Sequence, residues 1–221
     1  MFYLILFFIE LISLFFLSRK LHRKLGTFLF SLTRSRKITI YVMAVLFLPG
    51  TIVHELSHFL AGLFLLVPVG EIEFIPEFDE EGVKLGSAEI GKTDPIRRFL
   101  IGVAPLIVGT VLILLVVYLL SVKSIMGENI WLKRLIIGVM VFELGNTMFL
   151  SKKDLEGAWK IYLFLALLVI LLYISGLSLS PETMGVISGS KIAIAFEKAS
   201  VFMLVPLFID LGFIGSLKLF K

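Results

Sequence analysis

The sequence predicts an all-α polytopic membrane protein with about six transmembrane helices and a small membrane-associated β-hairpin or sheet. Of the 221 residues, 58% are hydrophobic and only 17% are charged, whereas soluble domains average about 45–50% apolar and about 25% charged residues. The apolar residues occur in runs near the length of about 20 residues that a helix needs to cross a bilayer. Cysteine is absent, which excludes disulfides and thiolate metal ligands.

Six apolar segments account for the expected helices. The stretch 18–37, between the first two segments, carries seven Lys and Arg residues. Such a cluster is typical of charge that flanks a membrane, so we expect the lipid bilayer as a partner and no nucleic acid. The first and last segments are short for spanning and are expected to tilt or lie shallow. The approximate bounds of the segments are 2–17, 38–66, 98–122, 131–150, 160–178 and 200–217.

The segment 68–97 has a different pattern. Residues 71–75 alternate charged and apolar side chains, which is the period of a β-strand. Asp79-Glu80-Glu81-Gly82 is a turn signal, and the alternation resumes at Val83. Pro76 places its strand at a sheet edge, because proline cannot donate to a ladder. We therefore expect a β-hairpin at the membrane surface.

The chain is expected to form a single membrane domain over residues 1–221. We expect its core in residues 38–160, with the hairpin of 68–97 as a loop within that core. Residues 1–37 and 161–221 would then form peripheral helices. No internal repeat or low-complexity linker divides the chain.

The motif His54-Glu55-Leu56-Ser57-His58 lies inside an apolar run from about Ile38 to Val69. A charged side chain at bilayer depth costs about 2.5–3.5 kcal/mol, so something must offset the cost of this motif. Two histidines four residues apart share one face of a helix and can bind one divalent metal ion. The chain contains only three histidines, and this motif uses two of them. We therefore expect a metal site here, with His54 and His58 as ligands.

The remaining chemistry of a catalytic zinc site has candidates nearby. Glu55 lies beside the histidine face, where it can take a proton from the attacking water and hand it to a leaving amine. Catalytic zinc also needs a third protein ligand and one open position. Glu143 is a carboxylate inside an apolar segment, whereas Asp154 comes just past the end of that segment. Spacing alone leaves both residues open as the third ligand.

Three motifs, in this order along the chain, resemble those of the site-2 protease family of intramembrane zinc metalloproteases. They are the motif of residues 54–58, the stretch Gly102-Val103-Ala104-Pro105-Leu106, and Asn146 followed eight residues later by Asp154. The resemblance covers about residues 38–160. It implies one zinc ion per chain, Asp154 as the third ligand, and Asn146 near the substrate backbone or the oxyanion. It also implies that transmembrane helices of other proteins are the substrates.

The resemblance gives the hairpin a role as well, because an exposed strand edge can hold an unwound substrate segment by β-augmentation. The chain departs from the family pattern in two places. It lacks prolines between Asn146 and Asp154, and Leu155 rather than glycine follows Asp154. Glu143 therefore remains the alternative third ligand.

The sequence thus predicts an intramembrane zinc metalloendopeptidase, an integral multi-pass protein of the cytoplasmic membrane of a prokaryote. One alternative is a membrane zinc endopeptidase of another class that uses Glu143. Another is a non-catalytic metal-binding membrane protein. If that protein were a transporter, it would need a polar path, for which Glu10 and Asp210 are the few further candidates. Two indications of membrane orientation disagree: the family orientation places 18–37 outside, whereas the positive-inside rule places it in the cytoplasm.

Overall fold

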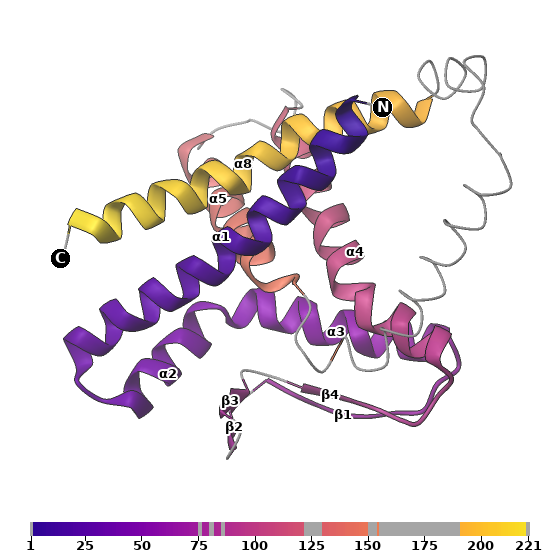
Figure 1. Cartoon of the computed structure of the whole chain (residues 1–221), viewed down its shortest axis with the longest axis horizontal. Helices are drawn as coiled ribbons and strands as arrows, with labels where there is room; N and C mark the ends of the chain where they lie inside the picture. Colours follow the sequence, from indigo (N-terminus) through magenta and orange to yellow (C-terminus); the bar gives the residue numbers. More distant parts are fainter. Residues whose placement is uncertain are drawn as a thin grey trace, which may run out of the picture.

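The computed structural model of the protein describes residues 2–74, 77–79, 82–84, 87–121, 130–149, 154 and 191–219. These residues are mostly helical and include four short strands (Figure 1). The helices are α1 (Phe2–Thr33), α2 (Arg36–Leu46), α3 (Leu48–Phe64), α4 (Pro95–Ser121), α5 (Ile130–Thr147) and α8 (Lys191–Leu219). The strands are β1 (Val69–Glu73), β2 (Glu77–Asp79), β3 (Gly82–Lys84) and β4 (Ser87–Ile90).

The helical fold class is confirmed, but about six transmembrane helices are not supported. Among the described residues, two helices are long and apolar enough to cross a membrane, through Pro95–Val116 and Phe196–Leu217. The bent pair α2 and α3 raises the number to three if it counts as one span. Helix α5 carries three charged residues within 18, Lys133, Arg134 and Glu143. The expected segment 160–178 lies outside the described residues.

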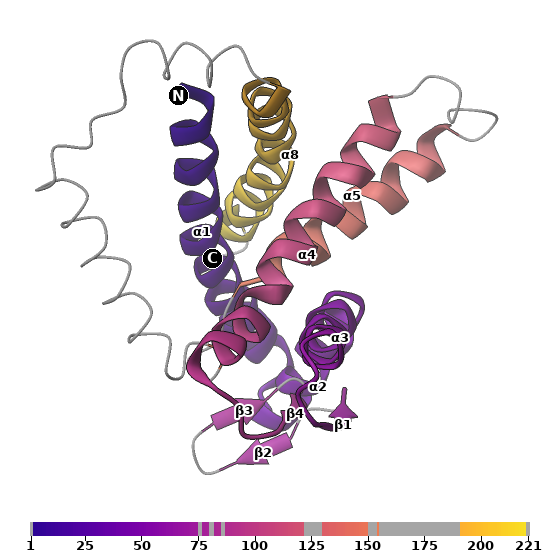
Figure 2. The same cartoon turned by 90° about the vertical axis from the view of Figure 1, so that its right-hand side faces the viewer.

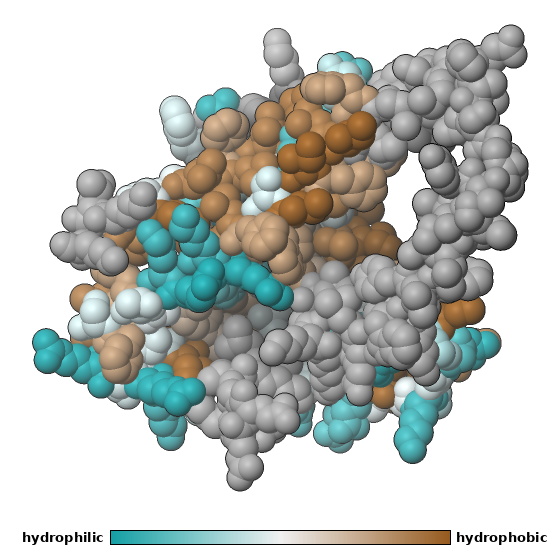
Figure 3. Space-filling view, in the orientation of Figure 1, coloured by the Kyte–Doolittle hydropathy of each residue, from teal (hydrophilic) through white to brown (hydrophobic). Residues whose placement is uncertain are grey.

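The long helices form two pairs that meet above α3. Helices α1 and α8 lie side by side, and so do α4 and α5 (Figures 1 and 2). Helix α3 packs against both α4 and α5 and crosses beneath their lower ends, with the strands on its other side. Hydrophobic side chains gather over the upper part of the face in Figure 3, and hydrophilic ones over the lower left, near the second half of α1 and α2.

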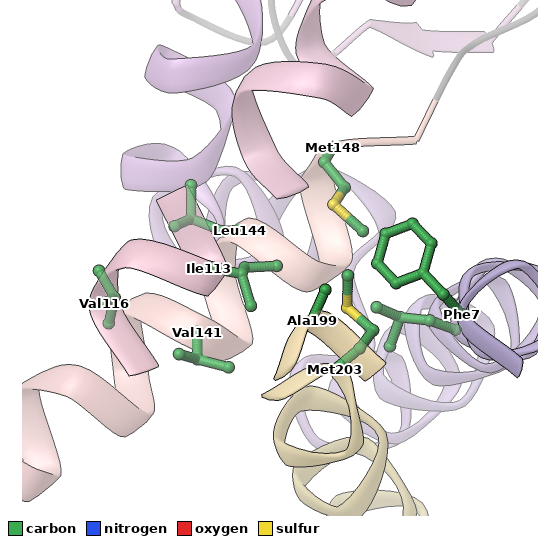
Figure 4. Packing of buried hydrophobic residues seen from close by; sticks show 9 residues of the cluster. Phe7, Ile113, Val116, Val141, Leu144, Met148, Ala199 and Met203 are labelled. Carbon is green, nitrogen blue, oxygen red and sulfur yellow. The ribbon is translucent and has the colours of Figure 1, made fainter. Parts of the chain in front are cut away.

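A hydrophobic core fills the space where the two helix pairs meet (Figure 4). Each long helix contributes at least one residue that is almost wholly buried, and Met148 closes the core just after the end of α5. The cluster fixes α1, α4, α5 and α8 around one centre, and that centre borders the start of α3. Its buried members are Phe7, Leu14, Ile113, Val116, Val141, Leu144, Met148, Ala199 and Met203.

The apolar run expected as one segment over 38–66 is two helices, α2 and α3, bent by 70° at Phe47. Pro49 explains the break: it has no N–H to donate to the preceding turn, yet it fits the first turn of a new helix. Phe47 is fully buried and stacks between His22 and Phe142, with ring centroids 4.3 and 5.9 Å away. The bend turns the beginning of α3 toward α5.

Two helices extend beyond the segments expected from hydropathy. Helix α1 runs past the apolar stretch 2–17 as far as Thr33, because Lys and Arg are good helix formers and no proline interrupts the basic residues. It ends where Arg34 takes a positive φ of 50°. Helix α8 begins at Lys191, whereas the apolar segment was expected at 200–217.

The expected hairpin is confirmed as two antiparallel two-stranded sheets. Strand β1 pairs with β4, with an irregularity between Val69 and Ile72, and β2 pairs with β3. Pro76, which was expected to mark an edge strand, lies outside the described residues. The β1–β4 sheet packs against α3, since a Cβ added at Gly62 would lie 2.5 Å from Cγ1 of Val69. The hairpin is therefore held beside the helix that carries the histidine motif.

Helix α4 begins at a capped end just after the hairpin. Asp94 Oδ1 accepts hydrogen bonds from the backbone N–H groups of Arg97 and Ile96, both at 3.0 Å. These bonds satisfy N–H groups that a helix cannot pair internally. The bond from Arg97 is the main reason that the pKa of the Asp94 carboxyl lies below its ordinary value. The cap sets where α4 starts, and so which of its residues face α3.

Candidate metal centre

Helix α3 carries the histidine motif into the angle between α4 and α5. His54 and His58 are four residues apart and lie on one face of the helix, with ring centroids 4.8 Å apart. His58 and Glu55 are buried, and the side chain of His54 is 11% exposed. Glu55 lies three residues before His58, about one helical turn away. The same-face arrangement expected from the spacing is therefore present.

The His54 ring is oriented by the end of α5. Its Nδ1 lies 2.6 Å from the backbone oxygen of Thr147, the last residue of that helix. A carbonyl oxygen can only accept, so Nδ1 carries the proton and donates it. The last carbonyls of a helix have no partner within the helix, which leaves this oxygen available to the ring. The bond leaves Nε2 with its lone pair directed away from Thr147, as a metal ligand requires.

The His58 ring is oriented by a carbonyl near the beginning of α4. Its Nδ1 donates to the backbone oxygen of Ile101 at 2.9 Å. In an unbroken helix this oxygen would accept the N–H of residue 105, but that residue is Pro105, which has none. The proline therefore leaves a carbonyl inside the helix for His58. This explains in physical terms why a proline stands in the motif of residues 102–106.

The free nitrogens of both rings point at the carboxylate of Asp154. The two Nε2 atoms are 3.2 Å apart, and Asp154 oxygens lie 3.6 Å from His54 Nε2 and 3.1 Å from His58 Nε2. Ligand atoms 2.0–2.1 Å from a tetrahedral zinc ion are separated by about 3.3–3.4 Å. The three donors fit that geometry, and no other described His, Asp or Glu residues form such a group.

The chemistry of the three facing atoms favours a cation among them. With both Nδ1 atoms protonated, each Nε2 of a neutral ring is an acceptor, as is the carboxylate. Facing acceptors that are withdrawn from water are costly unless something positive lies between them. These side chains expose only 7–13% of their surface. A single proton bridges one pair at a time, whereas one metal ion contacts all three atoms together.

Asp154 reaches the histidines because Gly102 leaves room for it. The position where a Cβ would stand on Gly102 is occupied by the backbone oxygen of Asp154. Any side chain at residue 102 would push the Asp154 backbone away from α4 and from His58. The small residue of the second motif thus admits the third candidate ligand.

Glu143, the alternative ligand, lies elsewhere. It is buried, and its Oε2 accepts a hydrogen bond from the backbone N–H of Gly50 at 3.4 Å. Gly50 belongs to the first turn of α3, where N–H groups lack helical partners and negative charge is favoured. A Cβ on Gly50 would lie 2.8 Å from the backbone oxygen of Glu143, so the two helices are in close contact there. Glu143 thus fixes the start of α3 against α5.

Asn146, expected near the substrate backbone or the oxyanion, is buried and faces α8. Its Nδ2 donates to the Phe142 backbone oxygen at 2.9 Å and to Asp210 Oδ1 at 2.8 Å. An amide nitrogen has two hydrogens, so these bonds use both. A role at the oxyanion would require this amide to turn away from Asp210, and it stays a prediction.

Two buried carboxylates of the helix bundle, which the sequence offered only as candidates for a polar path, have hydrogen-bond partners on other helices. Glu10 on α1 accepts a hydrogen bond from Ser200 on α8 at 2.7 Å, and Asp210 on α8 binds Asn146. The signal was a carboxylate inside an apolar segment, which must find a partner in the bundle. Sequence gives that signal but does not identify the partner.

Comparison with known proteins gives no relative from which a role could be transferred. No family model matches the chain, and neither a curated protein nor a solved structure matches it. The interpretation of the site rests on the positions and chemistry of its own residues.

Replacing the two candidate carboxylates separately distinguishes them. We expect Asp154→Ala to abolish stoichiometric zinc binding, because two imidazoles alone leave a four-coordinate site half empty. We expect Glu143→Ala to retain zinc but to lose thermal stability, since it leaves the start of α3 without its partner. Metal content of the purified variants and their thermal unfolding measure the two effects. Zinc loss in Glu143→Ala, with zinc retained in Asp154→Ala, would reverse the assignment.

A glycine pair tests the packing that admits Asp154. We expect Gly102→Ala to weaken zinc binding by about 10–100-fold, the range seen when the support of a metal ligand is lost. The matched control is Gly138→Ala, because a Cβ at Gly138 meets nothing within 4 Å. Titration against a competing chelator measures both affinities. Equal affinities in the two variants would show that Asp154 does not depend on the space at Gly102.

Pro105→Ala separates stability from metal binding. The alanine restores an N–H that competes with His58 for the Ile101 carbonyl, so we expect zinc affinity to fall about 10-fold. Proline inside a helix costs about 3 kcal/mol, so the metal-free variant is expected to unfold at the same or a higher temperature. Chelator competition and thermal unfolding measure the two quantities. Unchanged affinity would mean that His58 needs no freed carbonyl.

Proposed function

We propose that this protein is an intramembrane zinc metalloprotease that hydrolyses peptide bonds in the transmembrane helices of other proteins. One observation carries the proposal: the Nε2 atoms of two histidines and the carboxylate of a third residue meet within 4.8 Å of one another. Two imidazoles and one carboxylate are a common ligand set of catalytic zinc, and they leave one position open for chemistry.

Each residue of the site has its own role in the proposed reaction. His54, His58 and Asp154 would hold the ion, with the Thr147 and Ile101 carbonyls fixing the two rings. A zinc ion held there would supply Lewis acidity, which would make a water molecule nucleophilic near neutral pH and polarise the carbonyl of the scissile bond.

Glu55 is the general base and acid of the proposal. It takes a proton from the attacking water and returns it to the nitrogen of the leaving amine. Its burial and its position about one helical turn from His58 support this role. Glu143 cannot share it without giving up its bond to Gly50.

The apolar character of α4, which borders the site, supports a substrate that lies in the membrane. Helix α4, which carries Gly102 and the Ile101 carbonyl, is one of the two helices in the described part of the chain that are long and apolar enough to cross a bilayer. The chain would be a multi-pass membrane protein, in which site chemistry occurs at membrane depth. A helical peptide bond is shielded by its own hydrogen bonds, so a substrate helix must unwind before it can be cut.

The β1–β4 sheet offers a strand edge to which an unwound substrate segment could bind. It is two-stranded in the described residues, so each strand has an edge without a strand partner there. It packs against α3 at Gly62, one helical turn beyond His58. A strand edge binds an extended peptide through main-chain hydrogen bonds that require little sequence specificity.

Proteolysis of a panel of transmembrane peptides by purified protein tests the proposal. We expect zinc-dependent cleavage, which stops with a chelator and returns with added zinc. We expect Glu55→Gln to keep its zinc but to cleave about 10²–10⁴-fold more slowly, which is the usual contribution of a general acid–base group. Peptide fragments are followed by mass spectrometry, and metal content is measured on the same samples.

Glu197→Gln is the matched control for that substitution. It makes the same chemical change at an exposed position of α8, and its cleavage rate should equal that of the wild type. Equal rates for wild type and Glu55→Gln would end the proposed mechanism. Zinc binding with no cleavage of any peptide would instead favour a non-catalytic metal-binding protein.

A further inference from the structure

The carboxyl end of α5 is contacted by side chains from three other helices. Ser18 Oγ on α1 donates to the Asn146 backbone oxygen at 3.1 Å, and His54 on α3 donates to that of Thr147. Asp210 on α8 accepts from the Asn146 side chain. One of the three contacts therefore orients a candidate metal ligand, and the other two hold the same end of the helix.

The contact with Asp210 lies deep inside the bundle. Asp210 is 0% exposed and Asn146 is 5% exposed. The Asn146 amide also donates a hydrogen bond to the Phe142 backbone oxygen, one turn earlier in α5. The same side chain therefore bonds within α5 and to α8. A hydrogen bond to a carboxyl group in such a dry place is hard to replace, because breaking it leaves buried polar atoms unpaired.

A close approach of the two helices allows this short contact. A Cβ added at Gly145 would lie 3.2 Å from Cβ of Pro206, which is tighter than ordinary van der Waals contact. Pro206 lies four residues before Asp210 and so on the same face of α8. The space at Gly145 thus lets the short Asp210 side chain reach the residue next to it, Asn146.

The anchored residue directly precedes the carbonyl that orients His54. Thr147 is the last residue of α5, and the last turn of a helix frays unless it is tied down. If this carbonyl moved away, the Nδ1–H group of His54 would lose its hydrogen-bond acceptor. The neutral ring could then carry its proton on Nε2 instead. A protonated Nε2 cannot bind a metal ion.

We propose that Asp210 is a positioning residue of the metal centre. Through Asn146 it holds the end of α5, so that the Thr147 carbonyl keeps His54 in the tautomer that turns the Nε2 lone pair toward His58 and Asp154. The inference rests on the proposed metal-binding function and deepens it, because it gives a residue of α8 a role in orienting a metal ligand.

The structure offers a matched control for simple helix packing. Glu10 and Ser200 form another buried carboxyl hydrogen bond, which also involves α8 but joins it to α1. Removing either carboxyl group costs the bundle a buried hydrogen bond. Only the loss of Asp210 acts on the end of α5. Glu10→Ala is therefore expected to lower stability without changing His54.

Nitrogen-15 NMR of histidine-labelled, metal-free protein tests the inference without relying on catalysis. The chain has only three histidines, so His→Gln variants assign each ring. At about pH 8, where an ordinary imidazole is neutral, wild type should show His54 protonated on Nδ1 alone. Asp210→Ala and Asn146→Ala should each give a mixture of tautomers, and zinc affinity should fall about 10-fold. Asp210→Asn keeps an acceptor oxygen and should restore both properties.

The outcomes separate this inference from the proposed function. Retention of the wild-type His54 tautomer in both alanine variants would overturn it, as would an equal disturbance of His54 in Glu10→Ala. If one alanine variant fails to fold, the other reports on the same hydrogen bond. A tautomer that depends on Asp210 in a protein with no zinc affinity would overturn the proposed function and leave His54 positioning intact.

Discussion

The arrangement of the candidate metal centre depends on two main-chain carbonyls, one on each of the two helices that pack against α3. One belongs to Thr147, the last residue of α5, and the other belongs to Ile101, four residues before Pro105 in α4. Each accepts the Nδ1 proton of one histidine and so directs the Nε2 lone pairs of both rings to one point. Helix α3 must lie between α4 and α5 for both bonds to form at once. The chemistry of the site therefore requires this packing of the three helices.

Small residues make that packing close enough. In lipid there is little hydrophobic drive between helices, so association depends on close van der Waals contact and on interhelical hydrogen bonds. Gly50 admits the backbone of α5, Gly102 admits Asp154, and Gly145 admits Pro206. Each lies at or beside a residue with a polar contact: Glu143 at Gly50, Asp154 at Gly102 and Asn146 beside Gly145. Glycine positions here decide which polar groups can meet.

The sequence predicted the fold unevenly. It predicted helices over 98–122 and 200–217 and the strand alternation after Val69, because these depend on local periodicity. It did not predict the bend at Phe47, where a local signal, Pro49, was outweighed by an unbroken apolar run. Nor did it predict that α1 continues to Thr33, since hydropathy measures burial in lipid and not where a helix ends. About six spanning helices are not supported by the described residues, which do not include the expected segment 160–178.

By itself, the sequence determined that His54 and His58 share a helix face with Glu55 beside it, because a spacing of four residues fixes positions on any helix. Spacing alone left both Asp154 and Glu143 open as the third ligand, and only the family resemblance favoured Asp154, since a residue about a hundred positions away is placed by tertiary contacts. The tertiary structure brings Asp154 to the imidazoles through the space at Gly102, and assigns Glu143 to the start of α3. Which groups lie opposite a motif is decided by how helices pack, and a local pattern carries no record of that.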